Sequence, residues 1–283
     1  MKIYRINNVK IKESMDGEQI VILNQNHMEE CFRYINENNI TEIEIDNTMD
    51  KYNDLSFLNE CVDIKALYLD NHFIKDISII YSLKNLIKFG IEEPKIAIDF
   101  ADLLNLEQLY ITWHKKIEGL KNLSNLKELS IWNYAPKTQD LQEISSLENL
   151  ENLIITQSKI GSLNGIGKLP LKSLQLNFLR TLKEINEVGD VTSLEKVELE
   201  SCKKIIDYSY LGNLNQLQEL ILLKCGDIES IGFVKKLNNL KRLSFYGSNI
   251  KDGDIGYCEN IENLWFDNKK HYSHKISDFR DDF

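Results

Sequence analysis

The chain has 283 residues, of which 42% are hydrophobic and 28% charged, a balance typical of a well-packed globular protein. Its formal net charge is −10, so a nucleic-acid partner is not expected, because affinity for phosphates depends on a basic surface. An acidic balance favours cationic partners instead. Five scattered cysteines and an amino terminus without an apolar core predict a cytoplasmic protein, and no apolar run predicts insertion into a membrane.

Residues 1–39 are predicted to form an N-terminal cap of two strands and a helix. The stretches "KIYRINNVKI" and "EQIVILNQ" have strand composition and are joined by the polar "KESMDG". The stretch "HMEECFRYINENN" then places Met28, Cys31, Phe32 and Ile35 at helical spacing. These four side chains are expected to form the core of the cap.

Residues 40–270 repeat one frame, in which the first, fourth and sixth places are apolar, as in "LEKVELES" and "LQELILLK". The eleven copies begin at Ile40, Ile64, Leu86, Leu106, Leu126, Leu150, Leu171, Leu194, Leu217, Leu240 and Ile261. In a strand the fourth and sixth side chains point to one face and their neighbours to the other. No single copy can bury its apolar face alone, so the copies are predicted to stack around one shared core.

This frame resembles the leucine-rich repeat, L-x-x-L-x-L-x-x-N/C-x-L, and the length of the unit is similar to that of the short bacterial type found in internalins. The resemblance implies an α/β solenoid, a curved horseshoe with a parallel sheet on its concave face and short helical or 3₁₀ segments on its convex side. The predicted divisions are a cap over residues 1–39, about eleven repeats over 40–270, and a C-terminal cap or tail over 271–283. There Ile276 and Phe279 are expected to cover the last repeat, after which the chain is expected to fray.

The ninth place departs from the family, which usually carries asparagine there. The residues at this place are Thr48, His72, Pro94, His114, Tyr134, Ser158, Leu179, Cys202, Cys225, Ser248 and Lys269. Small polar side chains can still bond the turn backbone, whereas Pro94, Leu179 and Lys269 cannot do so well. Several irregular turns are therefore expected.

Cys225 has two interpretations, a reactive thiolate beside Asp227 or a core residue. Its position favours the core, because Cys202 holds the same place in the adjacent repeat. Cys61 and Cys258 replace a leucine of the convex side. A thiol buried among apolar groups is inert.

No catalytic motif was found in the sequence. His271 and His274 are three residues apart, but no third metal ligand is suitably spaced. The stretch "GSLNGIGKLP" lacks the spacing and the hydroxyl residue of a phosphate-binding loop. The chain is therefore predicted not to be an enzyme and to hold neither a cofactor nor a metal.

The third, fifth and seventh places are predicted to point outward from the concave face. They carry ten acidic and three basic residues and five large aromatic ones, and Trp113 lies beside them. Exposed aromatic side chains are typical of binding hot spots, although an outward strand face is polar in any protein. The predicted partner-binding residues are Glu42, Glu44, Asp46, Tyr68, Asp70, Tyr110, Trp113, Trp132, Glu198, Glu200, Tyr246, Trp265 and Asp267.

These features favour a non-catalytic protein–protein interaction module that binds a basic protein. The family resemblance leaves three functions open. The chain is expected to be an immunity protein that neutralises a bacterial toxin, a cytosolic regulatory scaffold, or an internalin-like adhesin without a visible export signal.

Overall fold

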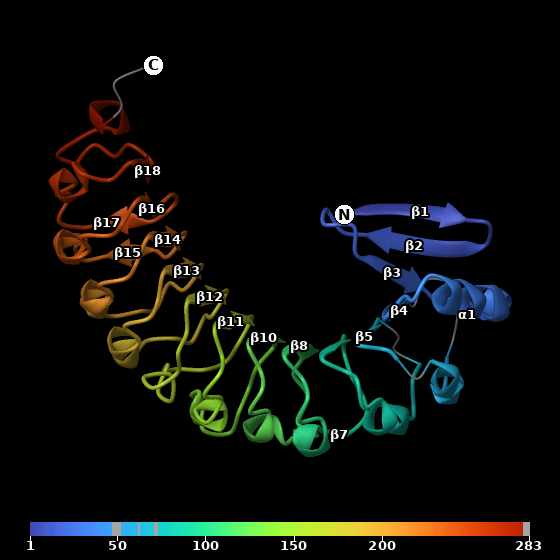
Figure 1. Ribbon diagram of the computed structural model, residues 1–283. Helices are drawn as coiled ribbons and strands as arrows, with labels where there is room; N and C mark the ends of the chain where they lie inside the picture. The colour runs from blue at the N-terminus through green and yellow to red at the C-terminus, as the bar shows by residue number, and fades with distance from the viewer. Residues whose placement is uncertain (47–51, 62, 71–72, 280–283) are drawn as a thin grey trace. The chain divides into compact units, whose positions relative to one another are not determined.

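The computed structural model describes residues 1–46, 52–61, 63–70 and 73–279 (Figure 1). Thr48 and His72, two of the ninth-place residues, lie outside these ranges. The chain divides into two compact units, Met1–Leu126 and Lys127–Phe283.

The cap of the first unit has three strands, so the prediction of two was wrong. They are β1 (Lys2–Ile6), β2 (Val9–Glu13) and β3 (Gln19–Ile22). β1 pairs antiparallel with β2, and β2 antiparallel with β3. The stretch expected to be one strand is a hairpin, because the chain reverses at Asn7, whose φ of 52° is left-handed.

Helix α1 (Met28–Glu37) follows β3 and confirms the predicted helix. It buries three of the four predicted core residues, Cys31, Phe32 and Ile35. Met28 is only half-buried.

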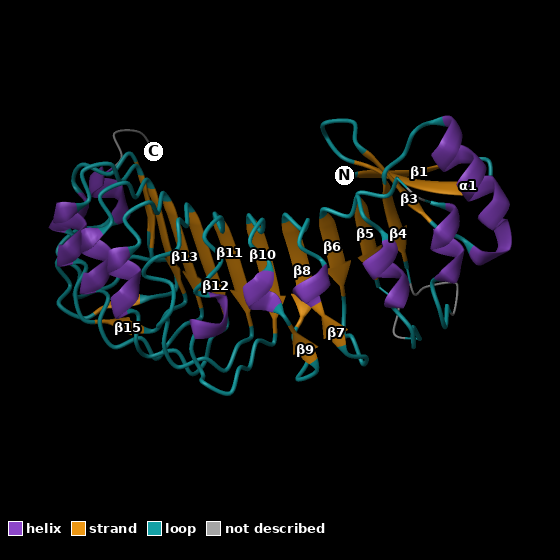
Figure 2. Cartoon of the chain, turned by 60° about the horizontal axis from the view of Figure 1, so that its bottom comes forward, coloured by secondary structure: helices purple, strands orange, loops and turns teal. Residues whose placement is uncertain are grey.

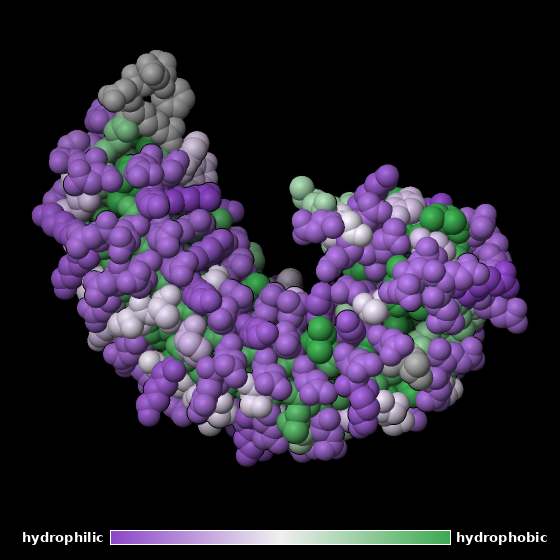
Figure 3. Space-filling model, viewed as in Figure 1, coloured by the Kyte–Doolittle hydropathy of each residue, from purple (hydrophilic) through white to green (hydrophobic). Residues whose placement is uncertain are grey.

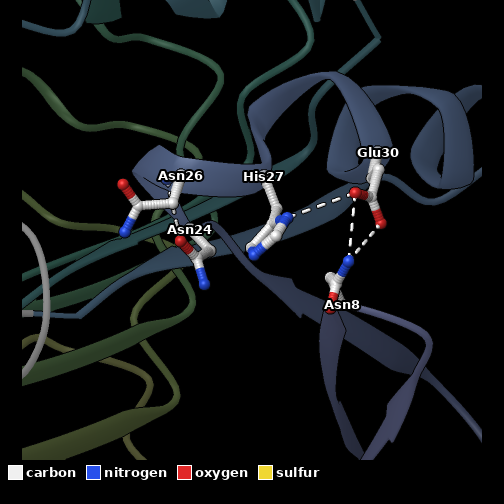
Figure 4. A network of polar contacts seen from close by, with 5 residues as sticks. All are labelled: Asn8, Asn24, Asn26, His27 and Glu30. Atoms are coloured by element: carbon white, nitrogen blue, oxygen red, sulfur yellow. Dashed lines mark hydrogen bonds and ion pairs between the residues drawn. The ribbon is translucent and has the colours of Figure 1, made fainter.

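A small polar network joins the cap hairpin to the first turn of α1 (Figure 4). The amide of Asn8 donates to both carboxylate oxygens of Glu30, at 3.1 and 3.0 Å, and the Nδ1 atom of His27 lies 3.2 Å from one of them. These hydrogen bonds, that of Asn8 first, hold the pKa of Glu30 below its usual value. Asn24 accepts a hydrogen bond from the backbone N–H of Asn26 and so caps η1 (Gln25–His27), the 3₁₀ turn before the helix.

Each of the eleven predicted repeats contributes one strand, which begins at the third place of the frame. In the first unit these are β4 (Glu42–Ile45), β5 (Ala66–Leu69), β6 (Lys88–Ile91) and β8 (Gln108–Thr112). In the second unit they are β10 (Glu128–Trp132), β11 (Asn152–Thr156), β12 (Ser173–Asn177), β13 (Lys196–Glu200), β14 (Glu219–Leu223), β16 (Arg242–Ser244) and β18 (Asn263–Trp265). Within each unit, neighbouring repeat strands pair in parallel, and β3 of the cap pairs in parallel with β4.

Matching places of the frame lie opposite each other, so the apolar places form continuous rows. In β13 and β14, for example, Val197 lies opposite Leu220 and Leu199 opposite Leu222, and all four are buried. This continuous core exists only because the repeats stack.

Short 3₁₀ turns connect the strands, as predicted, and lie on the side of each unit opposite its sheet (Figures 1 and 2). They are η2 (Ser56–Glu60), η3 (Ser78–Ser82), η4 (Phe100–Asp102), η5 (Leu120–Asn122), η6 (Gln142–Ile144), η7 (Asn186–Asp190), η8 (Ser209–Asn213), η9 (Gly232–Lys236) and η10 (Gly256–Cys258). A further 3₁₀ turn, η11 (Ile276–Phe279), follows the last strand. Two further pairs of short parallel strands lie away from the main sheet. They are β7 (Ile98–Asp99) with β9 (Ile117–Glu118), and β15 (Asp227–Ile228) with β17 (Asn249–Ile250).

In seven repeats the residue at the eighth place follows the strand in a left-handed conformation. This holds for Glu93, Asn133, Gln157, Phe178, Ser201, Lys224 and Gly247. The turn directs the ninth side chain inward.

The ninth-place side chains of three consecutive repeats bond the sixth residue of the repeat before. The thiol of Cys202 donates to the carbonyl of Leu176 at 3.4 Å, and that of Cys225 to the carbonyl of Leu199 at 3.1 Å. The hydroxyl of Ser248 donates to the carbonyl of Leu222 at 2.6 Å. Cysteine and serine therefore form a regular ladder here, in line with the expectation that small side chains at the ninth place can still bond the turn backbone.

At the end of the second unit, aromatic rings cover the last repeat. Phe266 stacks on Phe245 with ring centroids 4.9 Å apart, and Phe279 meets Phe266 edge-on at 6.0 Å. This confirms the predicted contact of Phe279. The predicted fraying concerns residues 280–283, which lie outside the described ranges.

Candidate functional site

The third, fifth and seventh side chains of the repeats point away from the core, and we call this surface the outward sheet face. The strand β13 shows the alternation, with Val197 and Leu199 buried and Lys196, Glu198 and Glu200 half-exposed. The visible surfaces of both units are mostly hydrophilic (Figure 3).

Three predicted acidic residues of the first unit are paired with lysines. Lys12 on strand β2 lies 2.7 Å from Glu44, and Lys10 lies 3.1 Å from Asp46. Lys88 on β6 lies 2.7 Å from Glu42. The charge predicted from the repeats alone is therefore partly neutralised by the cap.

The two predicted tyrosines of the first unit lie on either side of a glycine. Tyr68 on β5 and Tyr110 on β8 are half-buried, and their ring centroids are 6.4 Å apart. Between them, Gly90 on β6 holds the fifth place of its repeat. The outward sheet face has a hollow of about 360 Å³ at this point, and Asp70 and Glu92 line it. Trp113, which follows β8, is half-buried rather than exposed.

The charges of β13, β14 and β16 on the outward sheet face of the second unit are more loosely paired. Lys196 lies 3.7 Å from Glu198 and 3.3 Å from Glu219, and Arg242 lies 3.7 Å from Glu219. Glu200 is half-exposed at the end of β13. Exposed pairs at such distances contribute little to stability, so these charges remain available to a partner.

Exposed aromatic side chains distinguish the outward sheet face of the second unit. Trp132 is 48% exposed, Tyr246 54% and Trp265 53%. Phe178, in the left-handed turn after β12, is 38% exposed. Predicted Asp267 has a partner within the unit, because its carboxylate accepts a hydrogen bond from the backbone N–H of Gly247 at 2.7 Å.

The cysteines that were candidates for a reactive group have structural roles. All five cysteines are buried and unbridged. Burial raises the pKa of the Cys225 thiol to about 11 and that of Cys202 to about 12. Neither thiol therefore has the lowered pKa of a nucleophile.

The histidine pair and the glycine-rich loop are also engaged within the fold. The Nε2 atom of His271 lies 2.9 Å from the carbonyl of Ile250. The carboxylate of Glu187 accepts hydrogen bonds from the backbone N–H groups of Gly165 and Gly167 at 2.7 and 3.3 Å, so an anion of the chain itself occupies the loop. Among the described residues, no three His, Cys, Asp or Glu side chains are grouped as metal ligands would be.

The helices of the described chain include none with the length and apolar character that crossing a bilayer requires.

Solved structures with the same arrangement of repeats decide the fold. An internalin from Listeria monocytogenes matches 84% of this chain over 70% of its own, with 23% identity and a TM-score of 0.61. This chain has the leucine-rich-repeat fold. The leucine-rich-repeat ectodomain of the membrane receptor kinase GASSHO1/SCHENGEN3 from Arabidopsis thaliana, solved in complex with Casparian strip integrity factor 2, matches 81% of this chain over 29% of its own, with 16% identity and a TM-score of 0.56. No protein-family model matches the sequence, and no curated protein does.

Sequence reasoning missed three residues of the leucine-rich-repeat sheet that shape its outward face. Lys10 and Lys12 belong to the cap, and their alternation around buried Ile11 was the signal that both point outward. Gly90 interrupts the row of large side chains at the fifth place, and a glycine within a strand often marks a close approach of another group.

Proposed function

We propose that this chain is a non-catalytic module that binds a basic protein through its outward sheet face, and that it acts in the cytoplasm as an immunity protein against a toxin. The observation that carries the binding role is the exposure of Trp132, Tyr246 and Trp265 on one face of the second unit. Large aromatic side chains gain nothing from facing water and are enriched at binding hot spots.

The size of this surface supports a protein as the partner. Trp132 on β10 and Trp265 on β18 are separated by six strand spacings, which corresponds to roughly 30 Å at about 4.8 Å each. A standard protein–protein interface spans such a distance, whereas a small molecule does not.

The charges support a basic partner. Glu198, Glu200 and Glu219 lie on neighbouring strands between the two tryptophans, where Lys196 and Arg242 form loose ion pairs with Glu198 and Glu219. An acidic field speeds the approach of a basic partner.

The neutralising role in the cytoplasm is supported by the five unbridged cysteines, which suit a reducing compartment. A protein that inhibits a toxin by covering its active surface needs to bind the toxin and needs no catalytic group.

The test is capture of the partner from the source cell with the full chain and with the combined change Trp132→Ala and Trp265→Ala. We expect the affinity to fall by about 2 kcal/mol or more, about 30-fold, since tryptophans at the centre of an interface contribute this much. Tyr210→Ala is the matched control, because Tyr210 is 38% exposed on η8, on the side opposite the sheet. Equal binding by both variants would remove the outward sheet face of the second unit from the proposal.

The toxin part is tested separately by expressing the captured partner with and without the chain. Growth arrest that the chain relieves supports an immunity protein. A partner without effect on growth contradicts that role and leaves the binding module standing.

A further inference from the structure

We propose that the hollow of the first unit receives an arginine side chain of the protein partner. This inference rests on the proposed function, because it assigns the chemistry of one contact on the outward sheet face. It concerns the first unit, whereas the exposed tryptophans belong to the second.

The hollow exists because Gly90 has no side chain. In the first unit the fifth places of the repeats are held by Glu44, Tyr68, Gly90 and Tyr110. A Cβ atom built on Gly90 would lie 2.9 Å from Cδ1 of Tyr68 and 3.8 Å from Cβ of Tyr110. The ring of Tyr68 therefore leans over the glycine, and any larger residue would displace it.

The two rings suit a flat cation. Their centroids are 6.4 Å apart and their planes are inclined by 45°. A guanidinium group stacks on aromatic faces, is weakly hydrated and is therefore easily taken up from water. An ammonium group is more strongly hydrated and lacks a planar face.

The charges around the hollow complement one cation. Asp70 and Glu92 follow β5 and β6 at the seventh place, and both line the hollow. Glu44 and Lys12 also line it, but they lie 2.7 Å apart and neutralise each other. Among the side chains that line the hollow, the remaining charge is that of Asp70 and Glu92, and a guanidinium group can donate to both carboxylates.

The volume admits a side chain and excludes a folded segment. The hollow measures about 360 Å³, and apolar Met1, Ile20 and Ile91 contribute to its lining. The aliphatic stem of an arginine would lie against these apolar groups while its head reaches the rings and carboxylates.

The experiment uses the full chain and N-acetyl-arginine amide as the probe, with N-acetyl-lysine amide and N-acetyl-citrulline amide as comparisons. Binding is followed by NMR shifts of the Tyr68 and Tyr110 ring protons. We expect saturable millimolar binding of the arginine probe, at least 5-fold weaker binding of the lysine probe, and no binding of the uncharged citrulline probe.

Two variants test the site itself. Gly90→Val fills the hollow and suits a strand, and the pair Asp70→Asn and Glu92→Gln removes the charge without changing shape. Each is expected to weaken arginine binding at least 10-fold, while Glu118→Gln, on β9 away from the main sheet, leaves it unchanged. Melting curves show whether Gly90→Val folds, and the amide pair decides the question if it does not.

Absence of saturable binding, equal binding of arginine and lysine, or binding that survives the amide pair would each overturn the proposal. None of these outcomes depends on the partner, so the proposed function can stand without this contact. Conversely, arginine binding to the hollow with no captured partner would support the site and contradict the proposed module.

Discussion

The outward sheet faces of the two units are built on the same frame but differ in how their charges and aromatic rings are held. In the first unit the side chains of Lys10, Lys12 and Lys88 are 22–31% exposed and lie 2.7–3.1 Å from Asp46, Glu44 and Glu42, and Lys88 also lies 3.8 Å from Glu18. In the second unit Lys196 and Arg242 are 41% and 51% exposed, and their pairs measure 3.3–3.7 Å. The aromatic rings follow the same division, half-buried in the first unit and exposed in the second.

Two of the three close pairs in the first unit arise from the cap, whereas the third, Lys88 with Glu42, joins two repeat strands. β2 extends the sheet of the first unit through β3, and this places Lys10 and Lys12 within reach of Asp46 and Glu44. No strand of this kind adjoins the described tryptophans of the second unit. A repeat frame therefore fixes which places face outward, while the neighbouring elements decide whether those side chains are available to a partner.

The largest expected effect is a loss of stability, and it tests the stacked apolar core that both units have. Leu67→Ala on β5 and Leu174→Ala on β12 each remove a fully buried side chain at the fourth place. We expect each to lower the free energy of unfolding by about 2–5 kcal/mol, because a cavity forms in a stacked core. Urea unfolding measures the change, and Gln175→Ala, at the adjacent outward place, should shift stability by about 0.5 kcal/mol or less. A small cost in only one unit would show that its core is less continuous than the frame implies.

The next effect concerns the ladder of the second unit. Cys225→Ala removes a buried thiol that donates to Leu199 and is expected to cost about 1–2 kcal/mol. Cys225→Ser should cost less, because Ser248 makes the same contact one repeat later. An alanine variant as stable as the serine variant would show that the hydrogen bond contributes nothing.

The pH dependence of the same thiol has a definite sign. The native pKa of Cys225 is raised to about 11, so the unfolded chain loses this proton at a lower pH than the folded one. The stabilisation is full below the ordinary thiol pKa and is lost as the pH rises from about 9 towards 11. Melting temperatures of the native chain should therefore fall more steeply over this range than those of Cys225→Ser.

The smallest effect sharpens the comparison of the two faces directly. Lys12→Met leaves the half-buried carboxylate of Glu44 without its cation and is expected to cost about 1 kcal/mol. Lys196→Met, in the more exposed cluster of the second unit, should cost about half of this or less. Raising the salt concentration should shrink both values, and a larger cost for Lys196 would reverse the ranking of the two faces.

The frame of the repeats could be predicted from the sequence because its apolar places recur eleven times. The period alone located every repeat strand, and the positions of Cys202 and Cys225 in it explained their burial. The hairpin at Asn7 was missed because one residue of a short strand-like run reverses the chain. The pairs of Lys10 and Lys12 were missed because they join residues more than thirty positions apart.

The exposed tryptophans were expected from their places in the frame, but the hollow at Gly90 was not. The hollow depends on the orientation of the Tyr68 and Tyr110 rings beside Gly90, and this orientation could not be predicted from the sequence. The part of the exposed tryptophans in binding remains a prediction.

The ladder of the second unit also bears on how the length of such a chain can change. Each hydrogen bond of the ladder joins the ninth residue of one repeat to the sixth residue of the repeat before, so it depends only on two adjacent repeats. Removal of residues 217–239, one whole repeat, would bring Ser248 to the place of Cys225, facing the carbonyl of Leu199. The spliced chain would lose one strand of the outward sheet face and keep an unbroken series of these hydrogen bonds, so recombination in steps of one repeat can change the length of that face.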